Sequence, residues 1–220
     1  MTIQAHIAAL QESIPKDVTV VAVSKFHPSA MIREAYDSGQ RIFGESRVQE
    51  LVTKQQELPG DIQWHFIGSL QRNKVKQIAP FISLIHSLDS EKIMQEIDKQ
   101  GAAHQRVIPC LLQLHIAEEE TKSGFSPDEC RSFLAKGTWR ECSHVQIAGV
   151  MGMATFTENK TQLSAEFRLL KSLFEEFKAA YFTEEPAFKE ISMGMSGDYP
   201  VAIDEGSTMV RLGTVIFGER

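Results

Sequence analysis

The chain has 220 residues, 42% of them hydrophobic and 24% charged, with a formal net charge of −6. This balance is that of an ordinary globular protein, long enough to bury a large core without disulfides or a structural metal. The negative charge and the absence of any Lys/Arg-rich run exclude nucleic acid and acidic membranes as general partners, and no apolar run is long enough to span a membrane.

Short, β-branched apolar runs recur along the whole chain, each followed by a turn. The first run, at 18–24, is apolar on both faces, which is typical of a buried parallel strand. Seven more strands are expected at 41–45, 62–68, 82–88, 107–116, 145–153, 190–195 and 208–213.

Stretches with helical spacing lie between these runs. An extra helix is expected before the first strand, at 2–12, and others at 28–38, 47–58, 73–79, 90–104, 127–136 and 161–181. Ser46 is a suitable N-cap for the third of these helices. The alternation favours a closed, TIM-like (β/α)8 barrel of the α/β class over an open sheet. We expect one domain at 1–220, in which 1–17 form an N-terminal helical extension.

Lys25 follows the first expected strand directly, in the sequence VTVVAVSK. In a TIM-like barrel the residues after the strands line the face that carries active sites, so Lys25 is expected at the mouth of the barrel. Partial burial favours the neutral amine of a lysine, the form that condenses with an aldehyde to a Schiff base. The alternative is a lysine that only extends into solvent from a strand end.

Two turns rich in Gly and Ser stand near the C-terminus. Ser196 follows the seventh expected strand, and Gly213 and Thr214 follow the eighth and open a short helix. Backbone N–H groups and hydroxyls at such turns form anion cradles, and phosphate sites in TIM-like barrels commonly follow strands seven and eight. The alternative is turn chemistry without a ligand, since both residue types are common in loops.

Arg211 belongs to the eighth expected strand, which a closed barrel places beside the first strand. It is therefore expected near Lys25, where a cation favours the neutral amine and can also donate to a ring nitrogen. The alternative is an ion pair with a carboxylate such as Asp198 or Glu205.

Five further polar residues leave two roles open each. His65 either lines the pocket or is a core histidine with satisfied hydrogen bonds. Glu45 and Ser46 either face the site or cap the next helix, and Asp198 either orients the turn beside it or caps a helix. Lys122 lies in an acidic segment and is either a second amine or a solvated loop residue.

Several classes of site are absent from the sequence. The three cysteines, Cys110, Cys130 and Cys142, form no CxxC pair and favour free thiols in a reducing, cytoplasmic setting, as does a start without a secretory signal. No metal site is expected, because the histidines lack ligand spacing. Without GxGxxG, GxxxxGK[ST] or GxSxG motifs, nucleotide-binding oxidoreductases, kinases and hydrolases lose support.

Six segments resemble the pyridoxal phosphate homeostasis proteins, which are PROSC-like and built like the barrel domain of alanine racemase. The segments are AVSKFHP (22–28), IFGESRVQE (42–50), WHFIGSLQRNK (64–74), KSGF (122–125), GVMGMA (149–154) and SMGMSGDYPVAIDEGSTMVRLGTVIFGER (192–220). The resemblance runs from about Val18 to the C-terminus. It implies a fold-type III barrel that binds pyridoxal 5′-phosphate (PLP).

The same resemblance assigns roles to residues. It implies that Lys25 carries PLP as a Schiff base and that Arg211 faces the pyridine nitrogen. The phosphate-binding positions match Ser196, Gly213 and Thr214, with Met195 close by. The chain departs from the family at Ser46, where relatives commonly have an asparagine near the cofactor, so the local hydrogen bonding is expected to differ.

The resemblance implies a PLP carrier rather than an enzyme. An arginine at the ring nitrogen leaves the ring a poor electron sink. With the sequence ending at FGER, we also expect no counterpart of the separate domain that supplies a second base in alanine racemase. We expect a cytoplasmic monomer or weak dimer that buffers PLP, delivers it to apo-enzymes, releases it to free amino acids and affects vitamin B6 and amino-acid homeostasis. The alternatives are a weak PLP-dependent amino-acid racemase or lyase and an aldolase-like barrel that binds sugar phosphates through Lys25.

Overall fold

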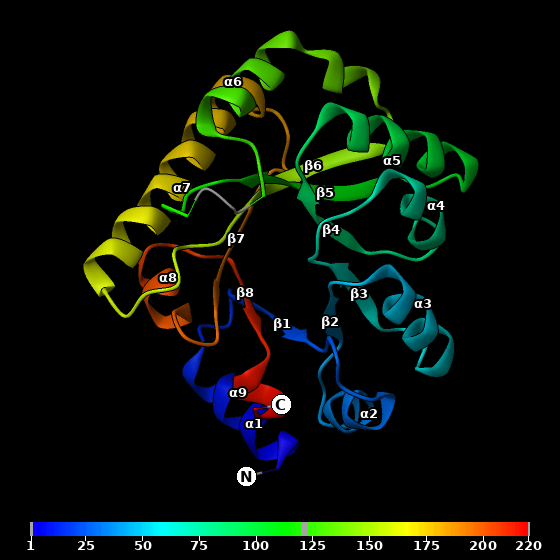
Figure 1. Ribbon diagram of the computed structural model, residues 1–220, viewed down its shortest axis with the longest axis vertical. Helices are drawn as coiled ribbons and strands as arrows, with labels where there is room; N and C mark the ends of the chain where they lie inside the picture. Colours follow the sequence, from blue (N-terminus) through cyan, green and yellow to red (C-terminus); the bar gives the residue numbers. More distant parts are fainter. Residues whose placement is uncertain (1, 120–122, 220) are drawn as a thin grey trace.

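The computed structural model describes residues 2–119 and 123–219. In this part of the chain, eight parallel strands pair in sequence order, and the last pairs with the first (Figure 1). The strands are β1 (Thr19–Val23), β2 (Ile42–Glu45), β3 (Gln63–Phe66), β4 (Leu84–Leu88), β5 (Ile108–Leu114), β6 (Val145–Gly152), β7 (Glu190–Met195) and β8 (Met209–Leu212). The expected α/β barrel is confirmed, with each strand a few residues shorter than or equal to its apolar run.

Helices surround the barrel and connect successive strands (Figure 1). They are α1 (Ile3–Ser13), α2 (Ser29–Asp37), α3 (Val48–Glu57), α4 (Val75–Ile78), α5 (Glu91–Ala103), α6 (Pro127–Lys136), α7 (Lys160–Tyr181), α8 (Tyr199–Asp204) and α9 (Thr214–Phe217), with 3-10 turns η1 (Arg72–Lys74) and η2 (Thr138–Glu141). The helix expected at 73–79 is thus divided between η1 and α4. The predicted N-cap at Ser46 is wrong, because α3 starts one residue later, with Arg47 at the cap and no side-chain hydrogen bond there.

The core has two parts. The larger part lies between the outer faces of the strands and the helices, and the long helix α7 contributes Phe167, Leu170 and Phe177 to it. A smaller apolar cluster fills part of the barrel interior and consists of Val21, Leu84, Leu111, Ala148, Met151 and Met209. Polar side chains occupy another part of that interior, and this division sets up the candidate site.

Two kinds of feature are absent from the described residues. Within 2–119 and 123–219, no helix has the length and apolar character needed to cross a membrane. Over the same residues, no three His, Cys, Asp or Glu side chains gather in a way that could hold a metal ion.

Candidate functional site at the mouth of the barrel

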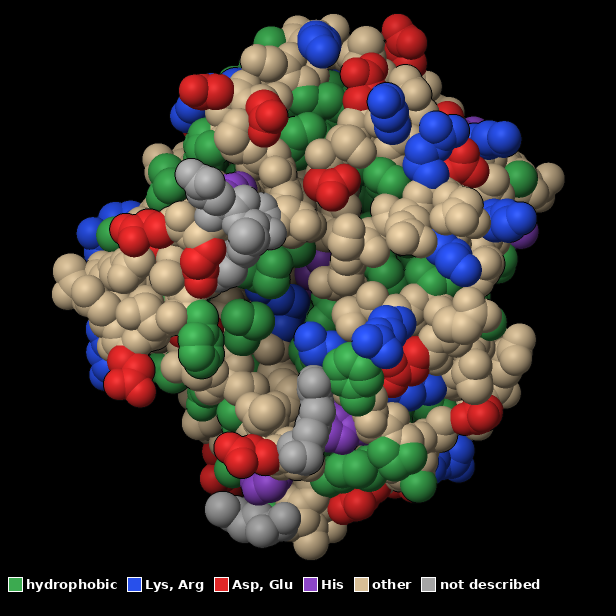
Figure 2. Space-filling model, in the orientation of Figure 1, with side chains coloured by type: hydrophobic (Ala, Val, Ile, Leu, Met, Phe, Trp, Pro, Cys, Tyr) green, Lys and Arg blue, Asp and Glu red, His purple; other side chains and the backbone are tan. Residues whose placement is uncertain are grey.

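The candidate residues follow several strands and meet at one end of the barrel, because parallel strands of a barrel all end on the same face. They are Lys25 after β1, Ser46 after β2, Met195 and Ser196 at the end of β7, Arg211 on β8, and Gly213 and Thr214 after β8. The molecule is hollowed at its centre, and basic side chains (blue) lie in and beside the hollow (Figure 2). Lys122, the possible second amine, lies outside the described residues.

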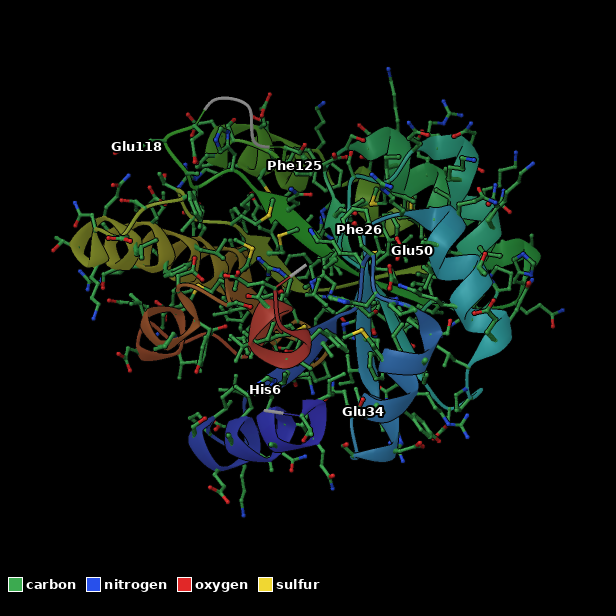
Figure 3. All side chains as sticks on the ribbon, turned by 60° about the horizontal axis from the view of Figure 1, so that its bottom comes forward. His6, Phe26, Glu34, Glu50, Glu118 and Phe125 are labelled. Carbon is green, nitrogen blue, oxygen red and sulfur yellow. The ribbon has the colours of Figure 1, made fainter. Side chains whose placement is uncertain are left out.

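Hydrogen bonds from neighbouring elements hold the turn that carries Lys25. The Ser24 hydroxyl donates to Glu45 Oε1 at 2.6 Å, and Lys54 Nζ donates to the Ser24 carbonyl at 2.7 Å. On the other side of Lys25, the Phe26 N–H donates to Glu50 Oε1 at 2.5 Å, and Figure 3 shows Phe26 and Glu50 near each other. The backbone is therefore fixed on both sides of Lys25, whose own side chain is half-buried.

Phe26 has a left-handed backbone, with φ at 67°. This region is unfavourable for a bulky residue that is not glycine and persists only where the surroundings hold it. The hydrogen bond to Glu50 and the Arg47 guanidinium, 4.6 Å from the centre of the Phe26 ring, are two such restraints. The chain therefore reverses sharply just after Lys25, and no sequence motif predicted this turn.

Glu45 and Lys54 form a buried ion pair beneath this turn. Lys54 Nζ lies 2.7 Å from Glu45 Oε1 and 2.6 Å from Glu50 Oε1, and Lys54 and Glu45 are 5% and 0% exposed. Glu45 Oε2 has no hydrogen-bond partner among the described residues. Burial raises the pKa of Glu45, and the hydrogen bonds from Lys54 and Ser24 oppose that rise.

The sequence offered one signal for this pair. Lys54 stands three residues after Leu51 and six after Val48, so it continues the apolar stripe of its helix. A lysine on such a stripe is buried and needs a carboxylate. Glu45 is that carboxylate, and it does not cap the following helix.

Arg211 is 4% exposed, and its guanidinium is fixed inside the barrel. Nη1 donates to the Ser192 carbonyl at 2.9 Å and to the Ser192 hydroxyl at 2.6 Å, and Nη2 donates to the Gly152 carbonyl at 3.0 Å. Burial lowers the pKa of Arg211 to about 10, against the attractive charge of Asp198, so the side chain is a cation at neutral pH.

The pairing of β1 with β8 brings Arg211 to the strand beside Lys25. Val21 pairs with Arg211 and Ala22 with Leu212, and Lys25 follows Ala22 by three residues. The alternative ion pair with Glu205 is wrong, since Glu205 Oε1 lies 2.8 Å from Arg168 Nη2 on the outside of the barrel.

The two Gly/Ser turns are joined to each other. The Gly213 N–H donates to the Ser196 hydroxyl oxygen at 3.1 Å. That bond leaves the Ser196 hydroxyl hydrogen available to a ligand, and the first N–H groups of α9, at Thr214 and Val215, have no acceptor inside the helix. A Cβ built on Gly197 meets nothing within 4 Å, so there is open space at this turn. Donors and space together fit a phosphate.

Asp198 orients the Ser196 turn. Its Oδ1 accepts from the Met195 N–H at 2.5 Å, and its own N–H donates to the Met195 carbonyl at 3.1 Å. Although Asp198 also occupies the N-cap position of α8, its side chain makes no cap hydrogen bond there. Met195 is 36% exposed, which places an apolar side chain on the rim.

Ser46 lies where two loops press together. A Cβ on Gly68 would come within 2.2 Å of the Ser46 carbonyl oxygen, so only glycine fits beside it. Ser46 is half-buried at the end of β2, in the same loop that leads into the residues that hold the Lys25 turn.

His65 is not at the mouth. Its Nδ1 lies 3.0 Å from His86 Nε2, and its ring lines a cavity at the opposite end of the barrel together with Leu84 and Met209. Sequence reasoning missed His86 and Ser192. The available signal was the alternation in ISLIHSL, where His86 shares a strand face with Leu84 and so points into the barrel.

Comparison with known protein families matches the whole chain to the proteins that its sequence motifs resemble. Residues 1–220 match the family model described as the N-terminal domain of alanine racemase. A pyridoxal phosphate homeostasis protein of Aquifex aeolicus is 39% identical over 202 residues, which cover 91% of this chain and 86% of that protein. The protein of that name from Haemophilus influenzae is 37% identical and covers 100% of this chain and 97% of its own length.

Solved structures agree. PipY of Synechococcus elongatus PCC7942, determined with PLP bound, is 36% identical and superimposes with a TM-score of 0.89 over 99% of this chain and 100% of that one. Alanine racemase of Clostridium difficile superimposes with a TM-score of 0.78 over 100% of this chain and 57% of that one, at 12% identity. This second likeness concerns the fold alone.

Proposed function

Because the chain belongs to the pyridoxal phosphate homeostasis protein family, we propose that it binds PLP at the mouth of its barrel, as a Schiff base on Lys25. The observation that carries the proposal is the parallel pairing of β1 with β8, which gathers an amine, a buried cation and a turn with hydroxyl and N–H donors at one end of the barrel.

Each part of PLP has a counterpart among these residues. Lys25 offers an amine to the aldehyde carbon, on a turn that is fixed at both neighbouring residues. Ser196 and Thr214 offer donors to the phosphate, where the joined turns leave open space. Arg211 has five N–H groups, of which three are used by Ser192 and Gly152, so two remain for an acceptor such as a ring nitrogen.

We propose that the chain is a carrier and not an enzyme. Bound PLP acts as an electron sink when its ring nitrogen is protonated. Arg211 is a buried cation that can only donate hydrogen bonds, so it favours the unprotonated ring nitrogen and disfavours a second positive charge beside it. The site therefore holds PLP covalently but gives little support to carbanion chemistry.

The cellular role that we propose is buffering of PLP and its delivery to apo-enzymes, with free amino acids as further acceptors. A reversible bond to one amine suits this role, because an incoming amine can replace Lys25 at the same carbon. The three cysteines are free thiols, which fits a reducing compartment such as the cytoplasm.

Borohydride reduction tests the covalent site. Purified protein treated with PLP and then reduced should carry the label on the peptide that contains Lys25, and Lys25→Ala should lose it. Lys92→Ala, at an exposed lysine of α5, is the matched control and should label like the original chain. A label that persists in Lys25→Ala on another lysine, such as Lys122, would contradict the proposal, as would labelling by a sugar phosphate only.

Turnover tests the carrier role. The loaded protein incubated with L-alanine should lose PLP to the amino acid without forming D-alanine or a cleavage product. Steady formation of D-alanine that disappears in Lys25→Ala would establish a racemase instead.

A further inference from the structure

A buried row of hydrogen bonds runs along the inside of the barrel, from Arg211 away from the mouth. Arg211 Nη1 donates to Ser192 Oγ at 2.6 Å, Ser192 Oγ lies 3.0 Å from His86 Nδ1, and His86 Nε2 lies 3.0 Å from His65 Nδ1. The four side chains come from β8, β7, β4 and β3, and each is at most 5% exposed.

The row ends at solvent on the opposite side of the barrel. His65 lines a cavity of about 550 Å³ at the end where the strands begin, with Gln63, Ser83 and Gln146 among its other polar residues. Nδ1 is the ring nitrogen of His65 that is bonded to His86, and the ring lines the cavity, so Nε2 is the nitrogen left to donate to water there.

The arginine fixes the direction of every bond in the row. Arg211 can only donate, so Ser192 Oγ accepts from it, and the serine's own hydrogen is left for His86 Nδ1. His86 then carries its proton on Nε2 and donates it to His65 Nδ1. By the same argument His65 carries its proton on Nε2, facing the cavity.

The opposite direction fails at one atom. If His65 donated to His86 and His86 donated to Ser192, the serine oxygen would accept twice and its hydrogen would need another acceptor. Arg211 and His86 are the hydrogen-bond partners of that oxygen in the described residues. An unpaired buried hydroxyl is costly, so the row has one favoured direction.

We propose that Ser192, His86 and His65 are positioning residues that hold the Arg211 guanidinium in place for the ring nitrogen of PLP, through a one-directional chain of hydrogen bonds that ends at the far end of the barrel. The role toward PLP rests on the proposed function, whereas the chain of hydrogen bonds is a property of the protein without ligand. Both histidines are neutral in it: burial lowers the pKa of His65 to about 3, and burial, with the neighbouring His65 and the Arg211 cation, lowers the pKa of His86.

Nitrogen NMR of the ligand-free protein tests the direction. With ¹⁵N-labelled histidine, long-range proton–nitrogen correlations identify which ring nitrogen carries the proton. We expect the Nε2–H form for both His65 and His86. The Nδ1–H form at both residues would reverse the chain and overturn the proposal.

Ser192→Ala tests the positioning role, with Ser87→Ala as its matched control. Ser87 is a buried serine of β4 whose hydroxyl has no partner in the described residues, so its loss leaves the chain intact. In the original protein and in Ser87→Ala, the Nη1 and Nη2 groups of Arg211 should give separate NMR signals because rotation is blocked. In Ser192→Ala, Arg211 keeps the two carbonyl acceptors but loses the hydroxyl, so these signals should exchange faster and broaden, and His86 should become a mixture of its two neutral forms.

The PLP dissociation constant gives the last readout. Ser192→Ala loses one charge-assisted hydrogen bond, so its PLP dissociation constant should rise about tenfold. Ser87→Ala should bind PLP like the original chain. Unchanged Arg211 and His86 signals in Ser192→Ala would refute the positioning role. If no variant binds PLP but the signals change as expected, the proposed function fails and the positioning chain stands.

Discussion

At the scale of single residues, the Lys25 turn depends on a charge pair that is unusual for its depth. Lys54 is the cation next to Glu45, and both side chains are almost fully buried. Taking two charges out of water is costly, and removal of only one partner leaves the other charge without compensation. Lys54 also donates to the Ser24 carbonyl, so the pair holds the backbone that carries the candidate amine.

Lys54→Met should therefore lower the free energy of unfolding by about 3 kcal/mol at pH 7. The additional change Glu45→Gln should restore part of this loss, because it removes the uncompensated charge. Urea denaturation followed by circular dichroism measures both. Lys92→Met, on the exposed side of α5, should change stability by less than about 0.5 kcal/mol. Additive effects of the two substitutions would show that the pair is not coupled.

Some residues of the site can be predicted from the sequence, whereas others cannot. Lys25, Arg211 and Ser196 could be placed there because each belongs to or follows a strand, and the barrel rule fixes where strands end. Partners such as Ser192 and His86 could not be matched in advance. They lie 106 positions apart, on strands whose facing across the barrel depends on register.

At the scale of elements, β6 contains a local irregularity that serves the site. Its pairing with β5 shifts between Cys110 and Leu111: Cys110 pairs with Ile147 and Leu111 with Gly149, so Ala148 is skipped on the β5 side. Gly149 has φ at 148°, and a Cβ there would lie 1.9 Å from the Glu190 carbonyl oxygen of β7. Beyond this bulge the strand ends at Gly152, whose carbonyl accepts from Arg211.

Gly149→Ala should destabilise the protein by about 3 kcal/mol or more, because the methyl group meets backbone and the residue adopts a strained conformation. Thermal unfolding with calorimetric detection provides the measurement. Gly60→Ala is the control, since a Cβ there meets nothing within 4 Å and the residue is exposed. A melting temperature of Gly149→Ala equal to that of Gly60→Ala would contradict the structural role of the bulge.

The kinds of elements could be predicted from periodicity, whereas several ends could not. The strands follow from short apolar runs that are buried on both faces, and the long helices follow from apolar residues at a period of 3.6. Ser46 illustrates the limit. It has the chemistry of an N-cap, yet its backbone packs against Gly68, and α3 begins after Arg47 instead. Tertiary contact between loops overrides local preference at such positions.

At the scale of the whole molecule, the polar barrel interior makes stability depend on pH. His65 and His86 are neutral and buried in the folded chain, and burial lowers the pKa of both below the ordinary value of 6.5. A group whose pKa is depressed by folding stabilises the protein above its unfolded pKa. That stability is lost as the pH falls toward the folded pKa, because the unfolded chain takes up the protons.

Each of these histidines should contribute a slope of about 1.4 kcal/mol per pH unit below pH 6.5. We expect the free energy of unfolding to fall steadily between pH 6.5 and pH 5, before most carboxylates titrate. His86→Gln should remove roughly half of this slope. His104→Gln, at an exposed histidine near the end of α5, should leave it as it is. The same slope in His86→Gln as in the original chain would show that His86 carries a proton in the folded protein.

The contact between the first and last helices has a consequence for synthesis on the ribosome. The ring of His6 in α1 donates from Nδ1 to the Ile216 carbonyl in α9 at 2.9 Å, and the two helices lie side by side (Figure 1). A four-residue helix is not stable alone, so α9 forms only against a partner that was translated before all eight strands. Until then α1 lacks its contact with α9 and packs only against earlier elements such as α2, and the turn at Gly213 and Thr214 is incomplete. On the proposed function, PLP can thus be bound only by polypeptides whose translation has passed the last strand.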